Sequence, residues 1–134
     1  MLSSQDKYLA GIITGEQTLT KEQYPCCERE GLLPLARKFE PALKDQYRKE
    51  NSHNVAVELA HQLVVIELLD QLGETGIDCL VFKGTALAYS HYEQPWHRSR
   101  VDTDLWIRER DVDAAFSALR DAGFQQQVSM PGRI

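Results

Sequence analysis

The middle of the chain carries apolar residues at helical spacing. Between residues 54 and 72 they form two adjacent stripes, the first made of Val55, Leu59, Leu63, Ile66 and Leu69 and the second of Val65, Leu68 and Leu72. Such a wide apolar surface is typical of a helix that is buried over much of its girth, and Gly73 is suited to end it. The pattern therefore predicts one long core helix.

The segments before this helix are more polar and more broken. Residues 1–30 are weakly periodic and are interrupted at Tyr24-Pro25, which predicts an N-terminal arm or short helices. From residue 31 to 51 apolar residues recur at helical spacing, and Pro41 suits the first turn of a helix, so two helices are expected there. Residues 31–134 are expected to form one structural unit.

Two short apolar runs after the long helix predict strands. Residues 77–82 are rich in β-branched and aromatic side chains and favour a buried strand, after which a helix is expected over 85–92. Residues 102–107 alternate polar and apolar side chains, which predicts a second strand. A helix over 111–122 follows, and Phe124 opens a third strand. This order predicts an α+β fold, with N-terminal helices before a small mixed sheet and its helices.

Composition narrows the class of protein. The chain has 134 residues, 43% of them apolar, and a net charge of −5, so we expect one globular domain without bulk attraction to nucleic acid or anionic lipid. Its apolar runs are far shorter than the roughly 20 residues that span a bilayer, and no basic leader opens the chain, so a cytoplasmic protein is expected. Cys26, Cys27 and Cys79 fit reduced thiols, and the scattered histidines do not suit a zinc site.

Asp102 and Asp104 form the sharpest motif in the sequence. Residues i and i+2 of a strand point to the same side, so the two carboxylates can share a cation. A divalent metal held by carboxylates and by substrate phosphates is the recurring design for displacement at phosphorus. Taken alone, the pair also fits plain solvated charge on a surface strand.

Lys83, Gly84 and Thr85 lie where the first predicted strand gives way to a helix. Backbone N–H groups at a helix start favour an anion, and glycine lets a phosphate approach the chain, while Thr85 and Lys83 add a hydroxyl and a cation. The alternative is that Gly84 only makes the turn and Thr85 caps the helix. Arg98 and Arg100 suit phosphate, the two aspartates or a structural ion-pair network.

Two further side chains bear on this region. Trp106 alternates with residues expected to face the core, so it is expected on the same side as the aspartates, where it would form a wall of a cleft. His61 lies on the predicted long helix and suits a buried or capping histidine better than a ligand. Neither residue alone defines a site.

The motifs follow one another in a recognisable order: a strand, K-G-T-A-L, a helix, Tyr92, Pro95, Arg98, D-x-D-L on a strand, and a helix that closes at Gly123-Phe124. In this order the chain resembles the nucleotidyltransferase-like proteins of the DNA polymerase beta superfamily, most closely the uncharacterised bacterial branch with a Lys-Gly pair at its phosphate turn. It is also similar to the abortive-infection toxin nucleotidyltransferases, which share a G-T-A-L turn. The resemblance covers residues 30–124 and implies a sheet of the nucleotidyltransferase type.

The resemblance implies two sets of site residues. The nucleoside triphosphate would be bound by Lys83, Gly84, Thr85 and Arg98. Asp102 and Asp104 match the first two catalytic carboxylates of the family, which bind Mg²⁺ or Mn²⁺. The family's third carboxylate, on a later strand, has no counterpart, because residues 124–134 contain no Asp or Glu.

Two functions follow from the resemblance. The first is transfer of a nucleotidyl group from a nucleoside triphosphate to an acceptor that the sequence does not identify. The second is a non-catalytic nucleotide-binding or protein-interaction module that keeps the turn and the aspartates. A third carboxylate from further residues, from a second copy in a homo-oligomer or from a partner protein would favour the enzyme.

Overall fold

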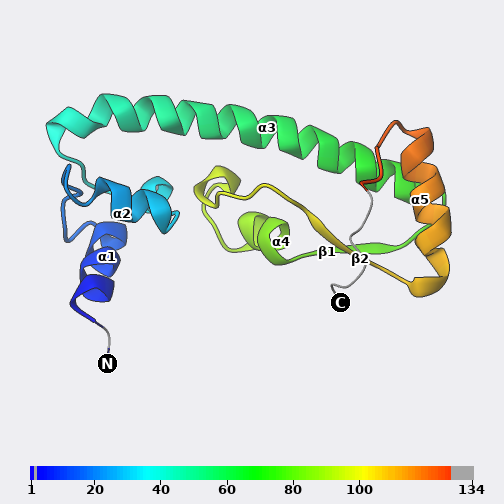
Figure 1. Ribbon diagram of the computed structural model, residues 1–134, viewed down its shortest axis with the longest axis horizontal. Helices are drawn as coiled ribbons and strands as arrows, with labels where there is room; N and C mark the ends of the chain where they lie inside the picture. Colours follow the sequence, from blue (N-terminus) through cyan, green and yellow to red (C-terminus); the bar gives the residue numbers. More distant parts are fainter. Residues whose placement is uncertain (2, 128–134) are drawn as a thin grey trace.

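The computed structural model describes residue 1 and residues 3–127 and has an α+β architecture, which confirms the predicted class (Figure 1). In chain order its helices and strands are α1 (Ser4–Thr14), α2 (Tyr24–Arg29), α3 (Lys44–Glu74), β1 (Cys79–Phe82), α4 (Lys83–Ser90), β2 (Asp104–Ile107) and α5 (Val112–Asp121). The long helix α3 runs along one side of the molecule. One of its ends meets the N-terminal helices, and the other meets the sheet and α5 (Figure 1).

The N-terminal helices have a small core of their own. A capping box opens α1, in which the Ser3 hydroxyl accepts a hydrogen bond from the Asp6 N–H and the Asp6 carboxylate accepts one from the Ser3 N–H. The buried side chains of this core are Ile12, Leu19, Tyr24, Cys27, Leu33, Ala36 and Leu43. The core therefore joins residues on both sides of position 30 and fastens α1 and α2 to the start of α3.

Of the two helices predicted between residues 31 and 51, the first is wrong, whereas residues 44–51 are helical as the first turns of α3. Residues 33–43 contain two single 3₁₀ turns instead, η1 (Leu33–Leu35) and η2 (Pro41–Leu43), each with a proline at its start. Between them the chain is extended and pairs with Leu19, whose N–H donates to the Lys38 carbonyl at 2.9 Å. Because this pairing occupies the Lys38 carbonyl and the Glu40 N–H, the chain stays extended at these residues and forms no helix. The long helix α3 begins at residue 44, ten residues before the predicted start at residue 54.

The sheet consists of β1 and β2, which pair antiparallel with Val81 opposite Leu105 and Phe82 opposite Asp104. One face packs against α3 and α5 in a second core around Leu72. The described part of the sheet is therefore antiparallel, whereas a mixed sheet is the sequence expectation. Residues 124–127 carry no strand, and residues 128–134, the rest of the expected third strand, lie outside the described residues.

The opposite face of the sheet carries large exposed side chains. Leu80 and Trp106 are direct partners across the two strands and are 60% and 58% exposed. In an antiparallel pair, alternate residues lie on one face, so Phe82 and Asp104 lie on this open face with them. The predicted placement of Trp106 on the same side as Asp104 is thus confirmed.

Both strands begin two residues later than predicted. β1 passes directly into α4 after Phe82, and Phe82 is the partner of Asp104. Asp102 and Thr103 therefore have no strand opposite them, and β2 starts at Asp104 instead of Asp102. α4 begins at Lys83, two residues earlier than predicted, while α5 agrees with the predicted 111–122 to within one residue.

None of the helices in the described residues combines the length and the hydropathy needed to cross a membrane. α3 has 31 residues, but charged and polar side chains are spread along it.

Candidate functional site

The N-terminus of α4 is the first element of the site. β1 ends at Phe82, and the helix begins at once with Lys83, whose φ of 54° lies in the left-handed region that residues other than glycine rarely adopt. Phe82 occupies the N-cap position, and in the described structure no side chain caps the helix. The first N–H groups of α4 thus have no intrahelical acceptor and can receive an anion.

Gly84 brings two arginines close to this turn. A Cβ atom at Gly84 would lie 3.9 Å from Arg98 Nε and 3.9 Å from Arg100 Cβ. Among the described residues, Arg98 Nε is buried and has no hydrogen-bond partner. The remainder of the Arg98 guanidinium is held by Tyr92, whose hydroxyl accepts from Nη1 at 3.4 Å and whose ring centroid is 5.8 Å from Cζ. A buried donor without an acceptor beside an open helix start suits a negatively charged group.

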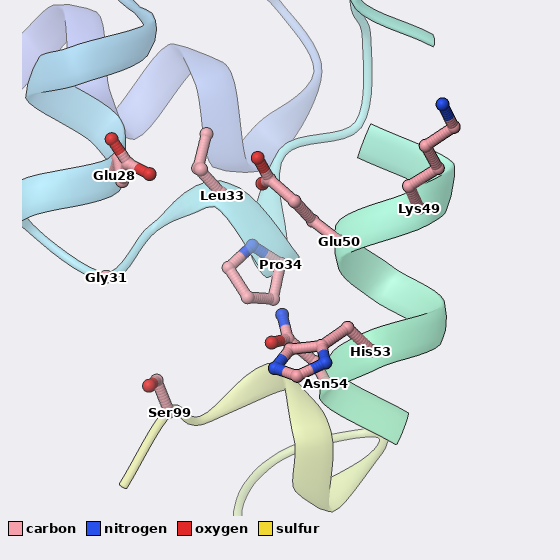
Figure 2. A pocket seen from close by; sticks show the side chains of 9 residues that line it. All are labelled: Glu28, Gly31, Leu33, Pro34, Lys49, Glu50, His53, Asn54 and Ser99. Carbon is pink, nitrogen blue, oxygen red and sulfur yellow. The ribbon is translucent and has the colours of Figure 1, made fainter. Parts of the chain in front are cut away.

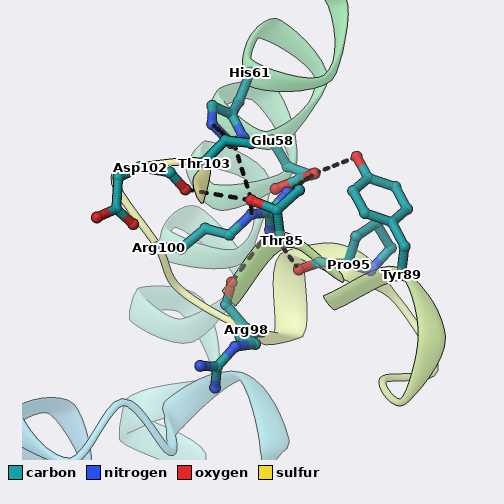
Figure 3. A network of polar contacts seen from close by, with 9 residues as sticks. All are labelled: Glu58, His61, Thr85, Tyr89, Pro95, Arg98, Arg100, Asp102 and Thr103. Carbon is teal, nitrogen blue, oxygen red and sulfur yellow. Dashed lines mark hydrogen bonds and ion pairs between the residues drawn. The ribbon is translucent and has the colours of Figure 1, made fainter. Parts of the chain in front are cut away.

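Thr85 is a buried member of a hydrogen-bond network, not the helix cap. Its side chain lies within the first turn of α4, and the residue is 3% exposed. The hydroxyl accepts from Arg100 Nε at 3.2 Å and contacts Thr103 Oγ1 at 2.9 Å and the Asp102 carbonyl at 3.3 Å (Figure 3). These contacts occupy the hydroxyl, so Thr85 can offer a phosphate only its backbone N–H.

Arg100 forms a structural ion pair, one of the alternatives that its sequence position allowed. Its Nη2 donates to Glu58 Oε1 at 2.6 Å, and the two side chains are 4% and 8% exposed. Its Nη1 donates to the Pro95 carbonyl at 3.4 Å (Figure 3). The Tyr89 hydroxyl also donates to Glu58, at 2.6 Å. Burial is the larger cause and the hydrogen bond to Glu58 the smaller cause that raise the pKa of Tyr89, so this hydroxyl keeps its proton and remains a donor.

Asp104 and Asp102 differ in their surroundings. The Asp104 carboxylate is 31% exposed and pairs with Lys83 Nζ at 3.1 Å. Asp102 lies before the strand, and its carboxylate points away from the Thr85 network, toward which its own carbonyl is turned (Figure 3). Within residues 3–127 no group of three or more His, Cys, Asp or Glu is arranged to hold a metal ion. Any cation site here therefore depends on the aspartate pair and on the bound substrate.

His61 is only half-buried, whereas a buried or capping histidine was expected. Its Nε2 lies 3.1 Å from Thr103 Oγ1, while its Nδ1 is buried with no partner among the described residues. Thr103 thus points toward α3, and Asp102 beside it in the chain points away (Figure 3).

Glu58 is the residue of this region that sequence reasoning missed. It lies beside the apolar stripes of the predicted long helix, where burying a carboxylate without a positively charged partner would cost much free energy. The sequence signal for this role was a single acidic residue among apolar neighbours. Such a residue, if buried, needs a positively charged side chain as its partner. The partner, Arg100, is 42 positions away in the chain, which no local pattern links to Glu58.

A cavity of about 470 Å³ is lined by a different set of residues (Figure 2). It is bounded by α2, η1 and α3, together with Ser99, and contains none of the predicted site residues. Its lining combines the carboxylates of Glu28 and Glu50 with Lys49 and His53. Such a mixture gives the cavity no single charge that would select a phosphate.

Comparison with known proteins agrees with the resemblance seen in the motifs. The model of a family described as "Uncharacterised nucleotidyltransferase" matches residues 24–130, well over half of the chain. The chain belongs to this nucleotidyltransferase family, and the matched span includes the α4 turn, both aspartates and the Glu58–Arg100 pair. No curated protein and no solved structure gave a significant match.

Proposed function

We propose that the chain binds a nucleoside triphosphate between the N-terminus of α4 and the aspartate pair, and that it transfers the nucleotidyl group to an acceptor, whose hydroxyl oxygen attacks the α-phosphorus and displaces pyrophosphate. The observation that carries the proposal is the junction of β1 and α4. There an open helix start and a buried arginine donor adjoin Lys83, whose ammonium lies 3.1 Å from the Asp104 carboxylate. Groups that favour phosphate and a carboxylate that favours a cation therefore adjoin one another.

The anion side of the proposed site consists of three kinds of donor. The N–H groups of Gly84 and Thr85 carry the partial positive charge of a helix start, and Arg98 supplies an N–H that needs an acceptor. Lys83 is 63% exposed on its side-chain surface and can turn toward a bound phosphate. Gly84 has no side chain to keep a phosphate from the backbone.

The cation side consists of Asp102 and Asp104. Carboxylate oxygens with substrate phosphates are the ligands that Mg²⁺ and Mn²⁺ use in such sites, so the residues present fit the metal that the family implies. When bound, such a metal would offset the charge on the phosphates and lower the barrier to displacement. Lys83 neutralises Asp104 while no cation is bound and would pair with phosphate when one is.

This exchange of partners predicts opposite effects for Lys83→Met. Removing the ammonium frees Asp104, so we expect the affinity for Mn²⁺ alone to rise by up to about fivefold, as suits a solvent-exposed ion pair. The affinity for a nucleoside triphosphate should fall at least about tenfold, because one charge-assisted hydrogen bond is lost. Isothermal titration measures both affinities, and Lys7→Met on α1 is the matched control. Changes of the same sign in both affinities would contradict the exchange.

A non-catalytic nucleotide-binding module is the second candidate. It is favoured by the absence of a third metal-binding carboxylate near Asp102 and Asp104 in the described residues and by the lack of any Asp or Glu after Asp121 in the sequence. General-base catalysis typically contributes about 10²–10⁴ in rate. We therefore expect residues 1–134 alone to bind nucleotide but transfer it slowly, unless further residues, a second copy or a partner protein supply a carboxylate.

A transfer assay separates the two candidates. Purified chain is incubated with Mn²⁺, triphosphates labelled at the α-phosphorus and a panel of hydroxyl-bearing acceptors, and product is compared with that of Asp104→Asn. Asp70→Asn, an exposed change on α3, controls for the loss of one negative charge. Transfer that is lost only in Asp104→Asn identifies a complete enzyme. Binding without transfer identifies the module, and a chain that binds no triphosphate at all contradicts both.

A further inference from the structure

The guanidinium of Arg100 links the elements that carry the proposed site. Nε donates to Thr85 in the first turn of α4, and Thr85 in turn contacts the carbonyl of Asp102. Nη1 donates to the carbonyl of Pro95 and, at 3.5 Å, to that of Arg98, so it also fixes the backbone of the arginine that lies against Gly84. One or two hydrogen bonds thus connect Arg100 to Arg98, to Asp102 and to the proposed phosphate turn, by which we mean residues 83–85 at the start of α4.

Glu58 holds this guanidinium in place from α3. One carboxylate oxygen, Oε1, accepts both from Arg100 Nη2 and from the Tyr89 hydroxyl, each at 2.6 Å. Tyr89 belongs to α4, so the same carboxylate ties α3 to the helix whose N-terminus forms the phosphate turn. The centroid of the Tyr89 ring lies 5.4 Å from Arg100 Cζ, so Tyr89 contacts both members of the Glu58–Arg100 pair (Figure 3).

The direction of the hydrogen bonds makes the arrangement specific. Arginine can only donate, so the Thr85 hydroxyl accepts from Arg100 and must direct its own proton to Thr103 or to the Asp102 carbonyl. A lysine in place of Arg100 could keep the charge pair with Glu58, but it could not reach Thr85 and Pro95 at the same time. The aspartate segment, residues 102–104, is linked to the turn at residues 83–85 through Thr85. This link therefore needs the planar guanidinium of arginine and not merely a positive charge.

The geometry points to Arg100, held by Glu58, as a positioning residue that keeps the phosphate turn of α4 and the aspartate segment at a fixed separation. The inference rests on the proposed function. Arg100 touches neither phosphate nor metal in this scheme, because its side chain is buried and each of its three guanidinium nitrogens donates to a protein acceptor. Its effect is to let one triphosphate engage Gly84, Arg98 and a cation at the aspartates simultaneously. Metal and nucleotide then strengthen each other's binding, and this mutual effect is the quantity that Arg100 controls.

The test measures that mutual effect in Arg100→Lys. The affinity for α,β-methylene ATP, which cannot transfer its nucleotidyl group, is measured by isothermal titration with and without Mn²⁺. In the wild-type chain we expect Mn²⁺ to raise the affinity at least about tenfold, within the usual range of coupling between sites. In Arg100→Lys the increase should fall to less than about twofold, while the metal-free affinity stays within about threefold of wild type. The variant should therefore resemble Asp104→Asn in its response to metal, although neither aspartate has changed.

Controls separate positioning from folding. Circular dichroism and thermal melting establish that Arg100→Lys is folded, and Arg120→Lys on the exposed side of α5 is the matched change. If Arg100→Lys does not fold, Tyr89→Phe replaces it, because that variant removes one of the two hydrogen bonds that anchor Glu58 and so holds the Arg100 guanidinium less firmly; its Mn²⁺ effect should fall at least about threefold. Full retention of the Mn²⁺ effect in the folded variant would overturn the positioning role while the proposed function stood. A wild-type chain that binds no α,β-methylene ATP would overturn both, so the two failures are distinguishable.

Discussion

Replacing Arg100 with alanine will lower the free energy of unfolding by about 3–5 kcal/mol, as expected when one partner of a buried ion pair is removed. The change leaves the Glu58 carboxylate, 8% exposed, without its cation, and deprives the Thr85 hydroxyl and the Pro95 carbonyl of donors. Since the total stability of a domain is only about 5–15 kcal/mol, a large part of it depends on this one side chain. Urea unfolding followed by circular dichroism measures the loss.

Two further variants test the cause of this loss. Arg120→Ala, an exposed arginine of α5, should change stability by less than about 0.5 kcal/mol. Combining Arg100→Met with Glu58→Met should recover much of the stability, because an apolar pair of similar volume can replace a buried ion pair. A loss below about 1 kcal/mol in Arg100→Ala would show that the pair does not hold the fold together.

Replacing Gly84 with aspartate will abolish triphosphate binding without weakening the fold. The new carboxylate would lie at the N-terminus of α4 and beside Arg98 Nε, which is 3.9 Å from the position of a Cβ atom. Negative charge is favourable at a helix start, and no neighbour is closer to the added atom, so the melting temperature should stay the same or rise. A phosphate in that place would meet a like charge, which costs several kcal/mol, so we expect at least about a hundredfold loss of affinity.

Gly84→Asn is the matched control for this variant. The amide has nearly the same size as the carboxylate but no charge, so the affinity for triphosphate should fall by much less than in Gly84→Asp. Equal losses in the two variants would indicate a steric effect, and unchanged affinity in Gly84→Asp would place the phosphate elsewhere.

The features that were predictable from the sequence are local ones. The places of Gly84 at a strand-to-helix turn and of Asp104 on a strand were predictable because each belongs to a short motif in which neighbouring residues fix the local backbone. The helix through Leu72 was predictable because its apolar stripes repeat over several turns, but its predicted burial over much of its girth is wrong: in the described structure Leu63, in the middle of the first stripe, is 69% exposed. The nucleotidyltransferase family followed from the order of these motifs, and the family match confirms it.

The features that were missed depend on contacts between distant segments. The extended chain between η1 and η2 forms because it pairs with Leu19, which its own periodicity does not reveal. The hydroxyl of Thr85 suits a phosphate or a helix cap when only its neighbours are considered, yet Arg100 and Thr103 occupy it. Asp102 falls outside the strand because β1 ends opposite Asp104, a consequence of register that depends on both strands.

The central claim is that the α4 turn and the aspartate pair bind one ligand together. Nuclear magnetic resonance of the ¹⁵N-labelled chain tests this most directly, with spectra recorded on adding Mg²⁺ and α,β-methylene ATP and again after replacing part of the Mg²⁺ with paramagnetic Mn²⁺. The account predicts that the amide signals of Gly84, Thr85 and Asp104 shift together with the same apparent affinity, and that Mn²⁺ broadens Asp102 and Asp104 first. Shifts confined to the cavity lined by Glu28 and His53, or to other residues away from the turn, would contradict it.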